Sequence, residues 1–568
     1  MPDCSHCGAT RFEYEPPTFC CGNGKIKLAP IEVPDELYDL FTSPSEEAIE
    51  FRNNIRVFNC IFSFTSFGVK LDKELASARR GVYTFRAQGM VYHDLPGLNP
   101  NENGPSNFQL YFVDTENEVT NQMNVLQTST LSGGTVEKLI HVLEINPYAK
   151  IFRRLKDYPA MDEVQLHISK DVKLDQRVYN TPTPDQVAAI WVEGNNENMS
   201  CEHNIVVHAH SGHRYRIKHY YGCYDPLQYP LLFPKGETGW HQNIFKISTN
   251  ISRSSGRGTG QLRIVDIEDI TRQPQVINGE NNQKVSCREY SCYRLQIRNA
   301  RQSILLLAGR LLQQYTVDMY IKLETTRLDY FRRNQTNLRA ELYQGLIDSV
   351  SRGEKRGGEV GKRIVLPASF IGGPRDMRRI YLDALALVQR FGKPDLFITM
   401  TCNPEWKEIQ ENLYAGQQAQ DRPDLTSQVF RAKLQDLKDQ LFKKEIFGKV
   451  AAHVHVIEFQ KRGLPHAHML IILKSEYKIT TPEQFDRFVC AELPDKEKYP
   501  GLYDLVLKHM MHGPCGELNF KNSCMIEGKC KYHYPRSYCE STVQGKDGYP
   551  IYPRSYCEST VLKFVRRS

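Results

Sequence analysis

The stretch VHVIEFQKRGLPHAHMLIIL, residues 454–473, decides the fold of the C-terminal half of the chain. It begins with mixed apolar and polar positions typical of a strand, continues with the turn-like KRGLP, and ends in the strongly apolar HAHMLIIL. Side chains two residues apart lie on the same face of a strand. The predicted hairpin therefore places Glu458 and Gln460 alongside His466 and His468.

These four side chains have the chemistry of a divalent-metal site. Two imidazoles on one strand face, with an oxygen donor nearby, form a facial ligand set. From the residues alone, the oxygen donor is either Glu458 or Gln460. The neighbouring pair His453 and His455 points from the opposite strand face, so we expect it not to bind the ion.

A third His-x-His pattern, formed by His208 and His210, has His203 and His213 close by in the sequence. The pattern by itself is weak, because such pairs are most often structural or exposed. We favour a solvated basic strand over an independent metal site at this position.

Helices and strands alternate upstream of the hairpin. Apolar residues at helical spacing predict helices near 301–331, 377–392 and 428–447, and DLFITMT at 395–401 is typical of a buried strand. This order predicts an α+β fold for residues 285–510, with an antiparallel sheet and flanking helices.

The N-terminal half predicts a mixed α/β region over residues 51–250. From about Phe51 to Leu126, short strand-like runs alternate with Gly, Pro and Asn loops, whereas 134–157 has helical spacing. The strand-like runs lie at 60–69, 81–93 and 107–113. Residues 252–284 are rich in Gly, Ser and Asn and predict a loop or linker.

Length and composition set the broad class of the protein. A chain of 568 residues with 40% hydrophobic residues suggests three or four domains with sizeable cores. The sequence has neither a long apolar run nor the apolar core of a secretory signal, so we expect a nuclear or cytoplasmic protein with no membrane partner. A net charge of +7 permits a nucleic-acid partner without requiring one.

The sixteen cysteines indicate metal rather than disulfides, because thiols stay reduced in the expected compartments. In the C-terminal segment 511–568, a tight pair and two turn-rich stretches, GPCG and EGKC, suit tetrahedral zinc. The predicted ligands there are His512, Cys515, Cys524 and Cys530. The alternative is a set of buried thiols without metal.

A second zinc module is predicted over residues 1–30, which are too poor in apolar residues to fold around a core of their own. Its ligands are Cys4, Cys7, Cys20 and Cys21, and His6 is a possible substitute for one thiolate. The adjacent Cys20 and Cys21 depart from the usual zinc ribbon, which ends in a second C-x-x-C. Both zinc sites are expected to be structural.

The tail contains a direct repeat, YPRSYCESTV, at 534–543 and again at 552–561. Ten identical residues over so short a span suggest a recent duplication or a gene-prediction artefact. Two equivalent hairpin units are the structural alternative.

EFQKRGLPHAHML at 458–470 closely resembles the HUH motif of Helitron transposases, which are replication initiators of the HUH nuclease class. GKPDLFITMTCNPEW at 392–406 resembles the first Rep motif of that family. Shorter segments similar to the family are FTSFGV, RGVYTFRAQG, YDPLQYPLLFP, REYSCYRLQIR, QQYTVD and RAELYQGL. His453 and His455 are not family positions.

The resemblance implies an HUH/Rep-type sheet that acts on the single-stranded DNA of transposon ends. In such enzymes a tyrosine attacks the phosphodiester while Mg²⁺ or Mn²⁺ polarises the phosphate. The resemblance assigns His466 and His468 as metal ligands and favours Gln460 as the third, with Glu458 as the alternative. Candidate DNA-binding residues are Trp406, Phe459, Lys461 and Arg462, with core packing or a solvated turn as the alternatives.

The resemblance also implies parts that the sequence does not supply. The family's paired catalytic tyrosines lie on a helix beyond the HUH motif, but here Tyr534 with Tyr538 and Tyr552 with Tyr556 each enclose Pro-Arg-Ser, which disfavours a helix. No G-x-x-x-x-G-K-[ST] phosphate loop occurs. We therefore assign no catalytic residue and expect a truncated, inactive fragment. The alternatives are a non-catalytic DNA-binding remnant or a wrongly assigned reading frame.

Overall fold

The computed structural model describes most of the chain, and the remaining residues are not discussed. The described ranges are 3–71, 85, 87–102, 104–124, 131–158, 161–172, 174–178, 180–192, 204–208, 214–247, 284–298, 303–335, 366–414, 416–460, 463–489, 491–534, 539–545 and 550–553. Nearly all of the predicted linker at 252–284 lies outside them.

The chain divides into two compact units. The first comprises 1–382, 399–436 and 456–467, and the second comprises 383–398, 437–455 and 468–568. The division passes through several continuous helices and strands. Both units mix helices with small antiparallel sheets, which agrees with the expected mixture of α and β structure.

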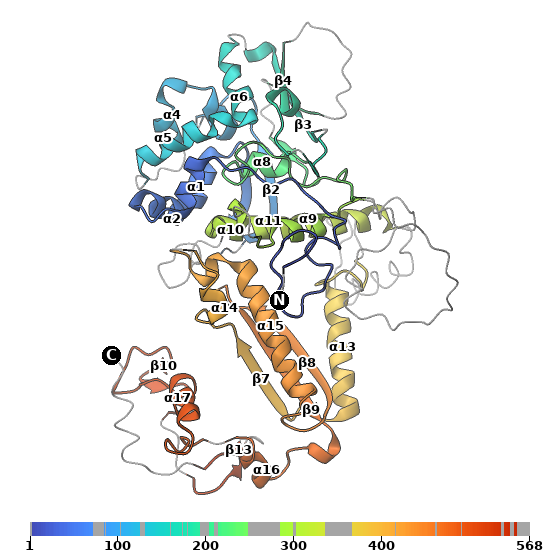
Figure 1. The fold of residues 1–568 in the computed structure, drawn as a ribbon, viewed down its shortest axis with the longest axis vertical. Coiled ribbons are helices and arrows are strands. Elements are labelled where there is room, and N and C mark those ends of the chain that lie inside the picture. The colour runs from blue at the N-terminus through green and yellow to red at the C-terminus, as the bar shows by residue number, and fades with distance from the viewer. Residues whose placement is uncertain are drawn as a thin grey trace, which may run out of the picture. The chain divides into compact units, whose positions relative to one another are not determined.

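The larger core of the first unit is helical (Figure 1). Its helices are α1 (Asp35–Thr42), α2 (Glu46–Phe62), α4 (Glu118–Asn124), α5 (Gly133–Val142), α10 (Ile304–Leu307) and α11 (Arg310–Arg333). Apolar side chains at helical spacing explain this packing: Phe51, Ile55, Phe58 and Phe62 form one fully buried stripe on α2.

The second core of the first unit packs helices against two three-stranded sheets. One sheet has the order β1-β2-β6 and the other the order β4-β3-β5. The strands are β1 (Ser66–Leu71), β2 (Ala87–Leu95), β3 (Val164–Ser169), β4 (Ala188–Val192), β5 (Asn204–His208) and β6 (Tyr215–Ile217). The associated helices are α6 (Pro147–Arg154), α7 (Pro184–Val187), α8 (Tyr224–Gln228) and α9 (Cys287–Arg294).

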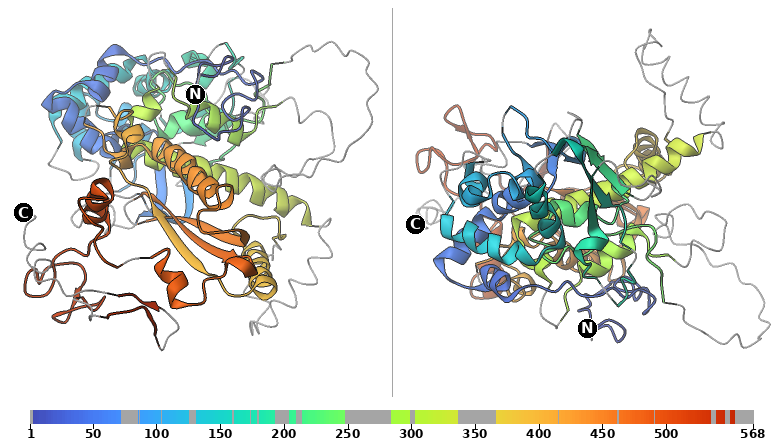
Figure 2. Two further views of the ribbon diagram at one scale, coloured as in Figure 1. Left: turned by 60° about the horizontal axis from the view of Figure 1, so that its bottom comes forward. Right: turned by 90° about the horizontal axis from the view of Figure 1, so that it is seen from above.

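The sequence from 366 onwards forms a third sheet with long helices. Its strands β7 (Leu396–Thr401), β8 (Val450–Phe459) and β9 (Pro465–Leu473) have the order β7-β9-β8. The helices are α13 (Pro374–Phe391), α14 (Lys407–Gln410) and α15 (Pro423–Phe442). Figure 2 shows α15 lying along this sheet, where Phe442 stacks on His453 of β8.

The C-terminal segment is made of short elements. They are α16 (Pro482–Asp486), α17 (Pro500–His509) and the two-stranded pairs β10 (Met525–Ile526) with β11 (Lys529–Cys530) and β12 (Val543–Gln544) with β13 (Pro550–Ile551). Most of the repeated block lies outside the described residues, so its duplication is not tested. None of the helices in the described ranges has both the length and the apolar character needed to cross a bilayer.

Two local expectations are wrong. Residues 60–62, the start of the run at 60–69 that was expected to be strand-like, belong to α2. Residues 107–111 form a short 3-10 helix closed by a capping box between Ser106 and Gln109. The predicted helix over 301–331 is divided, because Gly309 adopts a φ of +47° between α10 and α11. The hairpin at 454–473, the strand at 395–401 and the helices at 134–157 and 377–392 are confirmed within a few residues.

Candidate metal centres

The hairpin of β8 and β9 gathers one of the three candidate metal sites. Ligand atoms of Glu458, His466 and His468 lie within 4.8 Å of one another. The backbone N–H of Gln460 donates to the carbonyl of Leu464 at 3.0 Å, which closes the turn. Glu458 is exposed and His466 is buried, so the group opens to solvent on the side of the carboxylate. This spacing could allow all three to hold one divalent ion.

Strand β7 contributes two side chains beside these ligands that the sequence analysis did not select. Thr401 Oγ1 and His466 Nδ1 form a hydrogen bond of 2.7 Å, which leaves the other ring nitrogen of His466 for a metal. The ring of Phe397 stacks on His468, with centroids 5.6 Å apart and planes at 4°. The sequence feature that could have identified them is the alternation within the strand DLFITMT, which puts Phe397, Thr399 and Thr401 on one face.

The third ligand remains a prediction. Glu458 is the residue grouped with the two histidines, while Gln460 is two positions further along, at the turn, with a half-buried side chain. Both lie on the strand face that His466 and His468 share. We retain Glu458 and Gln460 as the two alternatives.

His453 and His455 lie on the other face of the sheet, under α15. Phe442 stacks on His453 with a centroid distance of 4.2 Å, and the two imidazoles lie 5.8 Å apart. Burial, with His455 and Lys438 nearby, lowers the pKa of His453 to about 4. His453 is thus a half-buried, neutral ring packed on an aromatic side chain, and neither histidine belongs to a described metal-ligand group.

The expected DNA-binding residues have different surroundings. Lys433 Nζ lies 5.1 Å from the ring centroid of Trp406, so a cation already occupies part of that aromatic surface. Phe459 is 62% exposed on β8. Lys461, Arg462 and His210 lie outside the described residues.

The N-terminal cysteines form the second candidate site. Sulfur atoms of Cys4, Cys7, Cys20 and Cys21 lie within 4.8 Å of one another, with Cys4–Cys21 and Cys20–Cys21 separations of 3.8 Å. Zinc–sulfur bonds of about 2.3 Å in a tetrahedron place sulfur atoms about 3.8 Å apart. The adjacent cysteines, unusual for a ribbon, therefore both reach one tetrahedral site.

The environment of Cys4 favours its thiolate form. Burial alone raises its pKa, but hydrogen bonds from the backbone N–H groups of His6 and Cys7 and from the thiols of Cys20 and Cys21 lower it to about 6. The backbone N–H of Gly24 also donates to the sulfur of Cys21 at 3.2 Å. Such N–H···S contacts stabilise the thiolates that a metal requires.

The third candidate site lies in the C-terminal segment. Ligand atoms of His512, Cys515, Cys524 and Cys530 lie within 4.8 Å of one another, and His512 Nε2 is 3.5 Å from the sulfur of Cys530. Cys524 and Cys530 flank the β10–β11 turn, where Glu527 and Gly528 have positive φ. Both cysteine-rich groups thus have the residue types and spacing that could hold a metal such as zinc.

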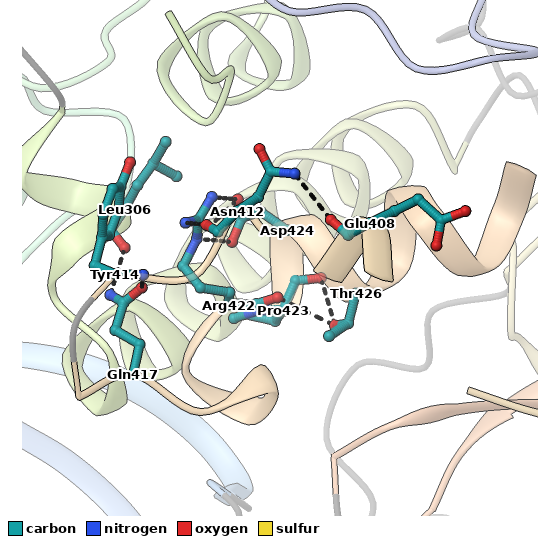
Figure 3. A network of polar contacts seen from close by, with 9 residues as sticks. All are labelled: Leu306, Glu408, Asn412, Tyr414, Gln417, Arg422, Pro423, Asp424 and Thr426. Carbon is teal, nitrogen blue, oxygen red and sulfur yellow. Dashed lines mark hydrogen bonds and ion pairs between the residues drawn. The ribbon is translucent and has the colours of Figure 1, made fainter. Parts of the chain in front are cut away.

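A buried arginine organises the connection between β7 and α15. Arg422 is fully buried, donates to both carboxylate oxygens of Asp424 at 2.8–3.3 Å, and donates to the carbonyl of Asn412 at 3.1 Å (Figure 3). Gln417 of the same connection donates to the carbonyl of Leu306 in α10 at 3.4 Å. These bonds hold the segment that follows the first Rep-like motif against the helical core of the first unit.

A second buried network crosses the N-terminal core. His93 Nε2 lies 2.9 Å from Asp318 Oδ2, and the hydroxyls of Tyr224 and Tyr229 donate to the same carboxylate at 2.9 and 2.8 Å. One turn along α11, Lys322 Nζ donates to Asp225 Oδ1 at 2.6 Å. Asp318 and the Lys322–Asp225 pair are fully excluded from solvent.

Nothing in the sequence pairs these residues, because α8 and α11 lie 89–97 positions apart at these contacts, and β2 is further still from both. Two of the segments singled out in the sequence, YDPLQYPLLFP and QQYTVD, supply residues of this network. These residues are Tyr224, Asp225, Tyr229 and Asp318. Their role here is to hold α8 and β2 on α11.

The comparison with protein families agrees with this part of the chain. Residues 290–471 match the family described as Helitron helicase-like domain at N-terminus. The matched range begins in α9 and ends in β9, so it includes β7, β8 and all three residues of the first candidate site. A search of curated proteins found no match. The family match supports a Helitron helicase-like N-terminal region at residues 290–471 of this chain.

Proposed function

We propose that this chain is the DNA-binding N-terminal part of a Helitron-type rolling-circle transposase. It binds the single-stranded DNA of transposon ends and holds Mg²⁺ or Mn²⁺ on the β8–β9 hairpin. The observation that carries the proposal is the convergence of Glu458, His466 and His468 within a region that matches the Helitron helicase-like domain. A DNA-handling protein is expected in the nucleus or cytoplasm.

The residues fit a hard divalent ion. Two imidazoles and one carboxylate form a mixed nitrogen and oxygen set, and the exposed Glu458 leaves open positions for a phosphate oxygen. When bound, the ion polarises a phosphate of the strand. His466 keeps one ring nitrogen on Thr401, so its orientation is set before the ion binds.

We assign no nucleophile. The ring of Tyr534, one of the four candidates, stacks on His512 at 4.1 Å beside the C-terminal cysteine group. Tyr538 and Tyr556 lie outside the described residues. The proposal is therefore metal-assisted binding of single strands without cleavage by these residues, and a non-catalytic DNA-binding remnant is the related alternative.

The two cysteine-rich groups are proposed as structural zinc sites. The cluster of Cys4, Cys7, Cys20 and Cys21 lies near Arg298, whose guanidinium donates to the carbonyl of Cys7 at 3.2 Å. That contact joins the N-terminal segment to the residues that follow α9. Zinc at this site would fold a segment that has only a small apolar cluster of its own.

The test compares two histidine pairs of one sheet. Mn²⁺ binding to the purified chain is measured by titration calorimetry, and binding of a labelled single-stranded oligonucleotide by fluorescence anisotropy with and without Mn²⁺. His466→Ala/His468→Ala should abolish Mn²⁺ binding and the Mn²⁺-dependent part of DNA binding. His453→Ala/His455→Ala, on the opposite face, is the matched control and should retain both.

Two results would count against the proposal. Equal Mn²⁺ affinity for the two double variants would remove the metal site from the β8–β9 hairpin. A covalent adduct between the protein and the labelled strand, lost in His466→Ala/His468→Ala, would show that a nucleophile is present and would refute binding without cleavage.

A further inference from the structure

Phe397 is an aromatic side chain left open beside the candidate metal ligands. It lies in β7, whose residues alternate between half-buried and exposed, and its ring is 63% exposed. One surface of the ring is stacked against His468 at a centroid distance of 5.6 Å with planes at 4°. The near-parallel planes make Phe397 and His468 a flat platform at the edge of the site.

The surroundings of Phe397 do not resemble a core. Thr399 and Thr401 share its strand face, and both are exposed. Thr401 is already committed to orienting His466. Phe397 is therefore an exposed aromatic ring among hydroxyls and candidate metal ligands, where a bound molecule could cover it.

We propose that Phe397, supported by His468, is a base-stacking subsite for the nucleobase next to the phosphate at the metal ligands. The inference rests on the proposed function and adds a ligand contact to it. A single strand whose phosphate lies at Glu458, His466 and His468 must place the attached base within one nucleotide of that position. Every base has a π-face, so a flat, rigid aromatic surface accepts it without reading the sequence.

The C-terminal segment offers a matched control. Phe520 has nearly the same exposure as Phe397, 65% against 63%. It lies between Cys515 and Cys524 in the chain, outside the β7-β9-β8 sheet. The two phenylalanines thus differ in their place in the fold and not in residue type or accessibility.

The experiment uses the full chain with saturating Mn²⁺ and single-stranded oligonucleotides that carry one 2-aminopurine at successive positions. Phe397→Leu should weaken binding by about 5- to 100-fold, the equivalent of one lost base stack, and should remove the 2-aminopurine quenching seen at one position. Phe397→Trp should keep both the affinity and the quenching. Phe520→Leu should bind within about two-fold of the wild type.

Mn²⁺ titration separates stacking from support of the metal ligands. Unchanged Mn²⁺ affinity in Phe397→Leu, together with the loss of DNA affinity, is the expected result. Equal DNA affinities of Phe397→Leu and Phe520→Leu would overturn the inference and leave the proposed function standing. Loss of Mn²⁺ affinity in Phe397→Leu would also overturn it, because the ring would then act by holding His468. Absence of single-strand binding in the wild type would refute the proposed function and this inference with it.

Discussion

Replacing Lys322 with methionine tests whether the buried charge network holds the first unit together. Lys322 Nζ donates to Asp225 Oδ1 at 2.6 Å and lies 4.5 Å from the ring centroid of Tyr224. Both charged side chains have zero exposure. Methionine keeps most of the apolar stem and removes the charge, so the substitution isolates the ion pair from the packing.

The expected loss follows from the carboxylate left behind. Removing one partner of a fully buried pair costs about 3–5 kcal/mol, because the remaining charge has neither water nor a counter-ion. In the wild type, burial raises the pKa of Asp225 and Lys322 opposes that rise. Without the ammonium group the pKa of Asp225 rises further, and the carboxyl escapes part of the penalty by keeping its proton.

This linkage gives the effect a pH dependence with a definite sign. An acid whose pKa is raised in the folded state contributes no penalty below its unfolded pKa of about 4. Its folded state is destabilised as the pH rises towards the folded pKa. Lys322→Met should therefore cost less at pH 5 than at pH 8.

The assay is urea unfolding at pH 5 and pH 8, followed by the fluorescence of Trp240, which is buried in the same unit. Asp225→Asn added to Lys322→Met should recover most of the loss at pH 8, since the orphaned charge is gone. Lys433→Met, which breaks the partly exposed pair with Glu408, should cost less than about 1 kcal/mol. A loss below 1 kcal/mol for Lys322→Met at pH 8, or no recovery in the double variant, would refute the reasoning.

Three further outcomes are expected. Elemental analysis of the purified chain should find zinc, with a lower content in both Cys21→Ser and Cys524→Ser; zinc-free wild-type protein would contradict both cysteine sites. Burial raises the pKa of Glu237 from 4.5 to about 8, so the contribution of Glu237 to stability is most favourable below about pH 4.5 and falls towards pH 8, by up to about 1.4 kcal/mol per pH unit. Glu237→Gln should remove that fall in urea unfolding across this range, and an unchanged pH profile would exclude Glu237 as its source. Arg422→Met leaves the buried carboxylate of Asp424 without its counter-ion and should lower the free energy of unfolding by about 3–5 kcal/mol in the same assay. A loss as small as that of Lys433→Met would mean that the network in Figure 3 contributes little to stability.

The elements that were predicted correctly are those with strong local patterns. The β8–β9 hairpin follows from a turn with Gly463 and Pro465 between two apolar strands, and α13 follows from apolar residues at helical spacing. The structure also brings together the eight side chains of the two predicted cysteine-rich groups, because metal-ligand residue types and turn-rich spacing are local features. Their role as zinc ligands stays a prediction.

The errors occur where local signals conflict. Aromatic and β-branched residues at 60–69 favour a strand, but residues 60–62 continue α2, whose buried stripe of Phe51, Ile55, Phe58 and Phe62 packs as a helix. The apolar run at 107–111 was too short to distinguish a strand from a single helical turn, and the Ser106–Gln109 capping box decided for the turn. In both places tertiary packing and side-chain capping outweighed propensity.

The sequence by itself determined the ligands and their local order: His466 and His468 on one strand, a carboxylate or amide on the preceding strand, and two sets of cysteines. Only the tertiary structure decided what surrounds them. Thr401 and Phe397 reach the histidines because β7 pairs with β9, and Lys322 meets Asp225 across 97 positions of the chain. The spacing of the candidate ligands depends on backbone geometry over a few residues, which the local sequence encodes. The residues that contact them from other elements depend on long-range packing, which no local pattern encodes.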